Sequence, residues 1–209
     1  MSKSLDIAEN LALLSTKYTS STSTLDSVAL GSSTTGTFNG TLGSSVTFPA
    51  GHVLQVQSTT KTDVTTTSGL AVDQVADLTG MSVDITPKTT TSKFFVTFNL
   101  YVGVNTSDTI TFQLKRDSTD IAKGDDNGGY RCTAESIRTS GDAKYSLYNV
   151  SHSFLDDPTL SDLSTITYKL QWVNLYSTAV VYLNRSYDRA AAADRADAVS
   201  TISVMEIAG

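Results

Sequence analysis

Apolar and polar residues alternate along several stretches of this chain, and that alternation restricts the fold more than any other feature. In the stretch 93–102, one set of alternate positions is wholly apolar, whereas the other set mixes aromatic and polar residues. The same alternation recurs at 110–115, 148–154 and 166–172. A repeat of two residues places successive side chains on opposite faces of a strand, so each stretch is predicted to be a half-buried antiparallel β-strand.

Further short strands complete an all-β pattern. Connecting segments rich in Gly, Asp and Asn separate the predicted strands, as at 117–120 and 125–129. About ten short strands at this spacing are typical of an antiparallel two-sheet sandwich, and favour a jelly roll within that class. Strands around Phe94 and over 179–183 are apolar on both faces, so we expect a cyclic oligomer to bury one face. The shorter strands are predicted at 52–58, 63–67, 82–86, 119–123, 130–137, 178–185 and 199–207.

Residues 1–45 differ in composition from the rest and are predicted to form an N-terminal attachment arm, which leaves 46–209 as the sandwich, or knob, domain. Residues 4–14 have the spacing of a short helix, whereas 15–45 are rich in Ser, Thr and Gly and read as an extended or flexible segment. The helix is too short to be stable alone, so its apolar face either packs on its own domain or docks onto another subunit. The predicted docking residues are Leu5, Ile7, Leu11 and Leu14.

Charge and composition exclude several classes of partner. The net charge is −6 and the pI is near 4.7, so the phosphates of a nucleic acid are not an expected partner. We find no apolar run long enough to span a bilayer and no signal peptide, and the single cysteine excludes an internal disulfide framework. We therefore expect a soluble protein made inside a cell, with no membrane partner.

The residues that usually carry catalysis are few and scattered. His52 begins a predicted strand, and His152 lies on the apolar side of another. No serine lies in a nucleophile-elbow pattern, and Cys132 in mid-strand reads as a small buried hydrophobic residue. The expectation is a protein that is not an enzyme, with no catalytic residue, metal ligand or cofactor.

Two acidic clusters read as loops. Asp125, Asp126 and Asn127 have a composition that could wrap calcium, but a hairpin turn explains them better because the ligand spacing is absent. Asp156 and Asp157 precede a proline and are predicted to lie in a loop.

The segment 184–198 allows two interpretations. It is either an exposed loop before the last strand, or a surface whose Arg and Tyr residues contact a partner, since these types anchor interfaces. Aromatic residues on loops would also suit the recognition of a sugar. The candidate partner-facing residues are Tyr130, Tyr176, Arg185, Tyr187 and Arg189.

A succession of soft motifs extends over residues 50–208. The motifs are AGHVLQVQSTTKTD (50–63), MSVDITPKTTTSKFFVTFNLYVGV (81–104), FQLKRDSTDIAKGD (112–125), SFLDDP (153–158), VYLNRSYD (181–188) and STISVMEI (200–207). Their order resembles the β-sandwich domains of virion proteins of tailed bacteriophages, especially marine and cyanobacterial phages. The resemblance implies a trimeric jelly roll similar to the tumour-necrosis-factor or complement globular-head type, and it supplies no catalytic residue. Residues 1–45 do not match this pattern.

The residues and the resemblance together predict a phage virion structural protein. It would be a homotrimer that decorates or cements the capsid, or forms a head fibre, and it would dock through its N-terminal arm. The alternative is a tail-fibre or adaptor protein whose knob binds a host receptor or glycan. In either case the expected location is the virion, after synthesis in the host cytoplasm, and the expected partners are other copies of the chain, the capsid or another virion protein, and a host surface glycan.

Overall fold

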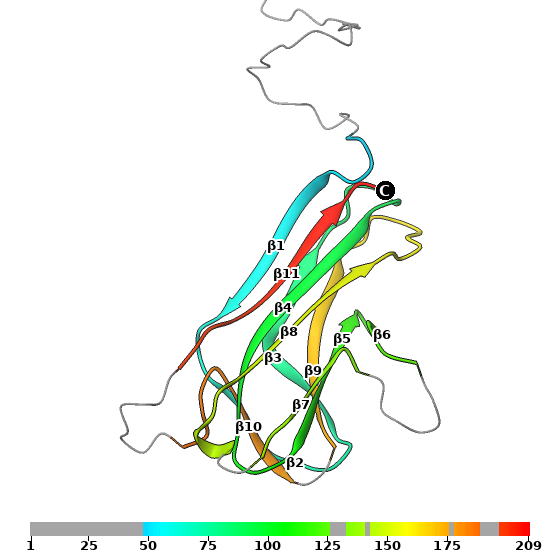
Figure 1. The fold of residues 1–209 in the computed structure, drawn as a ribbon. Coiled ribbons are helices and arrows are strands. Elements are labelled where there is room, and N and C mark those ends of the chain that lie inside the picture. The colour runs from blue at the N-terminus through cyan, green and yellow to red at the C-terminus, as the bar shows by residue number, and fades with distance from the viewer. Residues whose placement is uncertain (1–47, 126–132, 141–142, 176–177, 189–196) are drawn as a thin grey trace, which may run out of the picture. The chain divides into compact units, whose positions relative to one another are not determined.

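The computed structural model describes residues 48–125, 133–140, 143–175, 178–188 and 197–209. Over these ranges the chain is all-β, with two antiparallel sheets packed as a sandwich, which confirms the predicted fold class at that level (Figure 1). The predicted arm, its helix and the domain boundary near residue 45 lie outside the described residues. None of the described residues forms a helix long and apolar enough to cross a membrane.

Sheet A contains β1 (Val53–Lys61), β2 (Thr65–Leu70), β4 (Lys93–Val104), β8 (Tyr148–Asp156), β10 (Ala179–Leu183) and β11 (Ser200–Ile207). Sheet B contains β3 (Val75–Ile85), β5 (Thr109–Arg116), β6 (Thr119–Ile121), β7 (Glu135–Arg138) and β9 (Ile166–Asn174).

The strand β4 is the centre of sheet A. Along one edge, its residues 93–99 pair with β11 and its residues 102–104 pair with β10. Along the other edge, residues 94–102 pair with β8. β1 pairs with β11, and β2 pairs with β10. The strands β1, β11, β4 and β8 therefore form one continuous surface (Figure 1).

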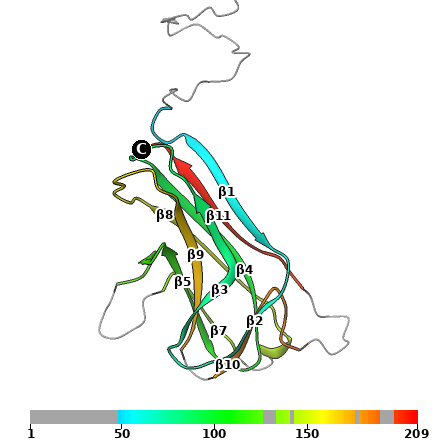
Figure 2. The same cartoon turned by 180° about the vertical axis from the view of Figure 1, so that it is seen from behind.

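The strand β9 lies between β3 and β5 in sheet B, which faces the viewer in Figure 2. The other edge of β5 pairs with β7 and then with β6. β3 begins at Val75, earlier than the predicted 82–86, because a register shift between Asp77 and Ser82 interrupts the alternation that the prediction relied on. Gly80 lies in this irregular part with a φ of 82°.

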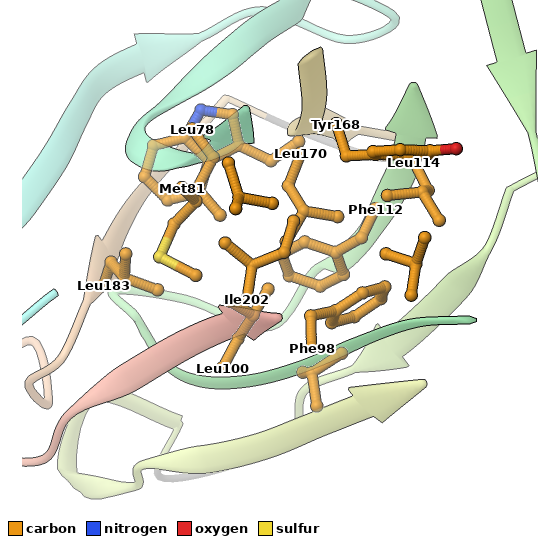
Figure 3. Packing of buried hydrophobic residues seen from close by; sticks show 14 of the residues in the cluster. Leu78, Met81, Phe98, Leu100, Phe112, Leu114, Tyr168, Leu170, Leu183 and Ile202 are labelled. Carbon is orange, nitrogen blue, oxygen red and sulfur yellow. The ribbon is translucent and has the colours of Figure 1, made fainter. Parts of the chain in front are cut away.

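The core consists of the inward-facing residues of the alternating strands. Phe94 of β4 and Tyr168 of β9 meet across the two sheets with their ring centroids 5.9 Å apart, and both are fully buried. Figure 3 shows Phe98, Leu100 and Ile202 of sheet A packed against Phe112 and other residues of sheet B. Burying each such side chain contributes about 1.5–3 kcal/mol. The two sheets are therefore held together mainly by the alternate residues that the sequence pattern indicates.

Asp156 joins the two sheets by polar contacts, and its predicted position in a loop is wrong. It is the last residue of β8 and is only 5% exposed. Its carboxylate accepts hydrogen bonds from Arg116 Nη1 at 2.6 and 2.7 Å and from the Tyr168 hydroxyl at 2.7 Å. Burial, together with the Asp156 carboxylate, raises the pKa of Tyr168 well above its ordinary value. A carboxylate can be buried here because partners from sheet B compensate for its lost hydration, and those partners are distant in sequence.

Glu206 fixes β11 at the end of sheet A next to the C-terminus. Its side chain is fully buried, and its two oxygens accept hydrogen bonds from Gln55 Nε2, Ser92 Oγ and the Lys88 backbone N–H, each at 2.5 Å. A carboxylate that accepts several hydrogen bonds can remain buried without a cationic partner. Because Glu206 points inward, its neighbour Met205 points outward, away from the core.

Candidate interaction surface

An apolar row crosses the outer face of sheet A. Paired residues on neighbouring strands point to the same side of a sheet, so the register of β1, β11, β4 and β8 aligns Val56, Met205, Phe95 and Leu155. Val56 and Leu155 are 51% and 50% exposed, and Met205 and Phe95 are partly exposed between them. We call these residues the apolar row. Contiguous exposed apolar side chains of this kind often mark a contact surface.

Two rows of small polar residues, which we call the polar rows, follow the apolar row along the same strands. The hydroxyl groups of Ser58 and Ser203 hydrogen bond to each other at 2.8 Å. Next to β8 the polar rows border a shallow hollow of about 500 Å³ that is also lined by Phe98 and His152. The first polar row consists of Ser58, Ser203, Thr97 and Ser153, and the second of Thr60, Thr201, Asn99 and Ser151. The apolar row and the polar rows contain no charged side chain, and together we call them the neutral face.

The outer face of sheet B has the opposite character. Lys169 Nζ lies 3.1 Å from Asp77 Oδ2, and Lys115 pairs with Asp120 at 2.6 Å. Hydrogen bonds from Gln171 and Lys169 lower the pKa of Asp77 below its ordinary value. These two ion pairs are partly exposed, which is typical of a surface that faces water. The two outer faces of the sandwich are therefore suited to different surroundings.

A second feature is a cluster of two tyrosines and an arginine at the end of β10, which we call the Tyr–Arg cluster. The guanidinium carbon of Arg185 lies 4.0 Å from the centroid of the Tyr182 ring. The Tyr182 and Tyr187 rings are 5.7 Å apart and inclined at 57°. The Asp188 backbone N–H donates to the carbonyl of Lys144 at 2.9 Å, which joins this segment to the short 3₁₀ helix at 143–145. The tyrosine rings and the guanidinium thus form one surface patch, with Tyr187 38% exposed.

The hydrogen bonds of Asn184 fix the position of this cluster. It is fully buried and has a φ of 69°, a left-handed conformation that asparagine tolerates better than most residues. Its Nδ2 donates to the carbonyls of Lys61 at 2.7 Å and Asp63 at 2.9 Å, and its Oδ1 accepts from Ser200 Oγ at 2.6 Å. Its backbone N–H donates to the Tyr101 carbonyl at 2.7 Å. The chain therefore turns at a fixed point directly after β10, and Arg185 is held where it meets Tyr182.

Gly103 of β4 provides the space for this turn. A Cβ atom at this position would lie 2.2 Å from the Arg185 carbonyl oxygen and 2.8 Å from Ser186 Cα. Both atoms belong to the backbone, so neither can move aside without displacing the turn. Only glycine permits the segment 185–186 to lie this close to β4.

The structure brings together two of the predicted partner-facing residues, Arg185 and Tyr187. Of the segment 184–198 the structure describes 184–188 and 197–198, where Asn184 and Ser186 are almost completely buried and Tyr187 is 38% exposed, so both interpretations of this segment stay predictions. The other predicted site residues lie outside the described part of the chain, namely Tyr130, Tyr176, Arg189, Leu5, Ile7, Leu11 and Leu14.

Sequence reasoning did not single out Tyr182 or Asn184. Tyr182 occupies an outward position in β10, where alternation alone does not separate an interaction residue from an ordinary surface residue. The partners of Asn184 come from three other parts of the chain, so no local pattern reveals its role.

The histidines of the chain have ordinary surroundings. His52 is exposed beside Phe48, and their ring centroids are 6.0 Å apart. His152 is half-buried, with its ring 5.9 Å from that of Phe98 and its Nδ1 4.0 Å from Glu135 Oε2. Among the described residues, no group of three or more His, Cys, Asp or Glu side chains is placed to hold a metal ion.

No known protein family matches the chain, and no curated protein is similar to it in sequence.

Proposed function

We propose that this chain is a structural protein of a tailed-bacteriophage virion, in which the sandwich forms a homotrimeric jelly-roll knob and the N-terminal residues dock onto the capsid or another virion protein. The proposal includes no catalytic role and no cofactor. The single observation that carries it is the neutral face of sheet A, which is suited to burial against further copies of the chain.

The pairing of the strands supports a jelly roll. β1 pairs with β11, β3 with β9, β4 with β8 and β5 with β7. Leaving aside the short β2, β6 and β10, the first strand pairs with the last, the second with the next to last, and so on inward. A long antiparallel hairpin rolled into a sandwich of eight strands has this nested order.

Self-association is supported by the contrast between the two outer faces. The centre of a protein interface is depleted in charge and enriched in aromatic residues and methionine; the neutral face carries no charge, and its apolar row contributes Phe95 and Met205. Each copy carries a net charge of −6, so copies repel one another over most of their surface. The neutral face is the place where two copies can approach with the least repulsion. The number three and the virion location come from the resemblance to phage β-sandwich proteins.

Substitution of Met205 by lysine tests self-association through this face. We expect the unmodified protein to have a mass near three times 22.2 kDa by light scattering, and the Met205→Lys variant to have a mass near that of one chain. The reason is that three lysines would be buried without partners at the contact. The matched control is Gln113→Lys on the outer face of sheet B, which should leave the mass unchanged. A Met205→Lys protein that keeps the mass of the unmodified protein contradicts association through the neutral face.

Removal of residues 1–14 tests the docking part of the proposal. We expect the shortened chain to keep the mass and thermal stability of the full chain but to lose sedimentation with capsids of the phage, because Ile7, Leu11 and Leu14 are the proposed apolar anchors. The control is the full chain with Leu25→Ala, a change outside the proposed anchor. Equal capsid binding by the full and shortened chains contradicts docking through this segment.

A second function, recognition of a host receptor or glycan by the knob, is favoured by the Tyr–Arg cluster. Exposed tyrosine and arginine side chains are the types that most often anchor binding. Figure 1 places β10 at the end of the sandwich away from the C-terminus, where the Gly51 backbone N–H donates to the Ala208 carbonyl at 2.7 Å.

A further inference from the structure

The partner of Arg185 sets it apart from several other basic side chains. Lys61, Lys93, Lys115, Arg116 and Lys169 each lie within 3.1 Å of an aspartate oxygen. Arg185 lies against an aromatic ring instead, and its Nε is buried without a hydrogen-bond acceptor among the described residues. A buried donor without an acceptor is costly, and a water molecule or an ion can complete such a bond.

The stacking on Tyr182 determines what Arg185 can bind. The ring covers one face of the guanidinium group, whereas the N–H groups lie in the plane of the guanidinium and are not used by the stacking. This planar fork matches a carboxylate, which it can bind with two parallel hydrogen bonds. Because the ring also holds the side chain in place and removes some of its water, less entropy is lost on binding and the charged hydrogen bonds are stronger.

Tyr187 provides a second type of contact beside the first. Its ring is 38% exposed and inclined at 57° to that of Tyr182. An exposed tyrosine offers a flat apolar face and a hydroxyl group at its edge, and this combination suits the C–H face and the hydroxyl groups of a sugar ring. Within the cluster, Tyr187 therefore offers a stacking surface and Arg185 offers hydrogen-bond donors.

The cluster is supported by a fixed backbone turn. Asn184 is held in a left-handed conformation by several hydrogen bonds, and Gly103 leaves room for the backbone of Arg185. Backbone conformations of this kind persist where the surroundings over-determine them, and they are concentrated at binding sites. Rigid support of this sort reduces the cost of ordering the site when a ligand binds.

We propose that the Tyr–Arg cluster binds an acidic sugar of a surface glycan, with a carboxylate of the sugar on Arg185 and a sugar ring on Tyr187. This inference rests on the second proposed function and adds to it the chemical class of the ligand. It assigns charge recognition to Arg185, and it assigns affinity for the sugar ring to Tyr187.

The test is an NMR titration of the full chain with an oligosaccharide that contains glucuronic acid, compared with the counterpart that contains glucose at the same position. We expect the acidic sugar to bind about tenfold more tightly, because a hydrogen bond to a charged group is stronger than one to a neutral group. Arg185→Gln should abolish this preference, Arg185→Lys should restore only part of it, and Tyr187→Ala should weaken both sugars. The matched control is Arg138→Gln, at an exposed arginine on β7, which should change neither affinity.

Equal affinity for the two sugars, no binding of either, or an equal loss in the Arg138→Gln variant overturns the inference. It is also overturned if Arg185→Gln has no effect on sugars but lowers the solution mass, because the cluster then belongs to a contact between copies. The mass and capsid measurements are independent of the titration. A protein that is trimeric and binds capsids but not acidic sugars contradicts this inference alone, whereas a monomer that binds acidic sugars contradicts the trimer alone.

Discussion

Replacement of Asn184 by alanine is expected to lower the free energy of unfolding by about 3–5 kcal/mol. The change leaves the carbonyls of Lys61 and Asp63 and the hydroxyl of Ser200 without their buried partner, and it places a Cβ-bearing residue that lacks a polar side chain at a φ of 69°. The measurement is urea unfolding at one fixed protein concentration, because the proposed self-association would make the stability depend on concentration.

Substitution of Asn184 by glycine separates the two causes. Glycine adopts a positive φ without penalty, so Asn184→Gly should be destabilised by about 1 kcal/mol less than Asn184→Ala, and the remaining loss is due to the hydrogen bonds. If Asn184→Gly is as stable as the unmodified protein, the hydrogen bonds of Asn184 contribute nothing and our account of the turn is wrong.

The second large effect is expected for Asp156→Ala, with a loss of about 3 kcal/mol in the free energy of unfolding. Removal of the carboxylate leaves the partly buried guanidinium of Arg116 and the buried hydroxyl of Tyr168 without their acceptor. It also removes a direct link between β8 of sheet A and β5 and β9 of sheet B. The measurement is again urea unfolding at one protein concentration.

The adjacent residue supplies a matched control. Asp157 pairs with Lys93 at 2.7 Å, but their side chains are 60% and 40% exposed. Asp157→Ala should therefore cost less than about 1 kcal/mol. Tyr168→Phe, which keeps the ring and removes only one of the hydrogen bonds to Asp156, should lie between the two aspartate variants. Similar losses for Asp156→Ala and Asp157→Ala would show that the buried position of Asp156 has no energetic consequence.

The sequence pattern was sufficient to predict the class of fold and which residues of the main strands face the core. Phe94, Val96 and Phe98 were predicted on one side of their strand and are buried, whereas Phe95 and Thr97 were predicted on the other side and are partly exposed. This prediction succeeded because burial on one face imposes the repeat of two residues directly on the sequence. It failed in the first half of β3, where a bulge around Gly80 shifts the register and interrupts the repeat.

The candidate surfaces could be predicted only in part, since they depend on pairings between distant residues. The apolar row forms only because the pairing register places Val56, Met205, Phe95 and Leu155 side by side on four strands. Alternation within one strand does not predict its register with a neighbouring strand. Arg185 and Tyr187 were recognised by residue type alone. Their support by Asn184 was missed because its hydrogen-bond partners lie 121 and 123 residues away on one side and 16 residues away on the other.

The pairing of β1 with β11 has a consequence for the order in which the fold can form. Val56 and Met205 belong to strands that are far apart in the sequence, so the apolar row exists only after β11 has paired with both β1 and β4. Long-range pairing slows folding. The surface that we propose for self-association is therefore completed late in folding, and partly folded copies lack it.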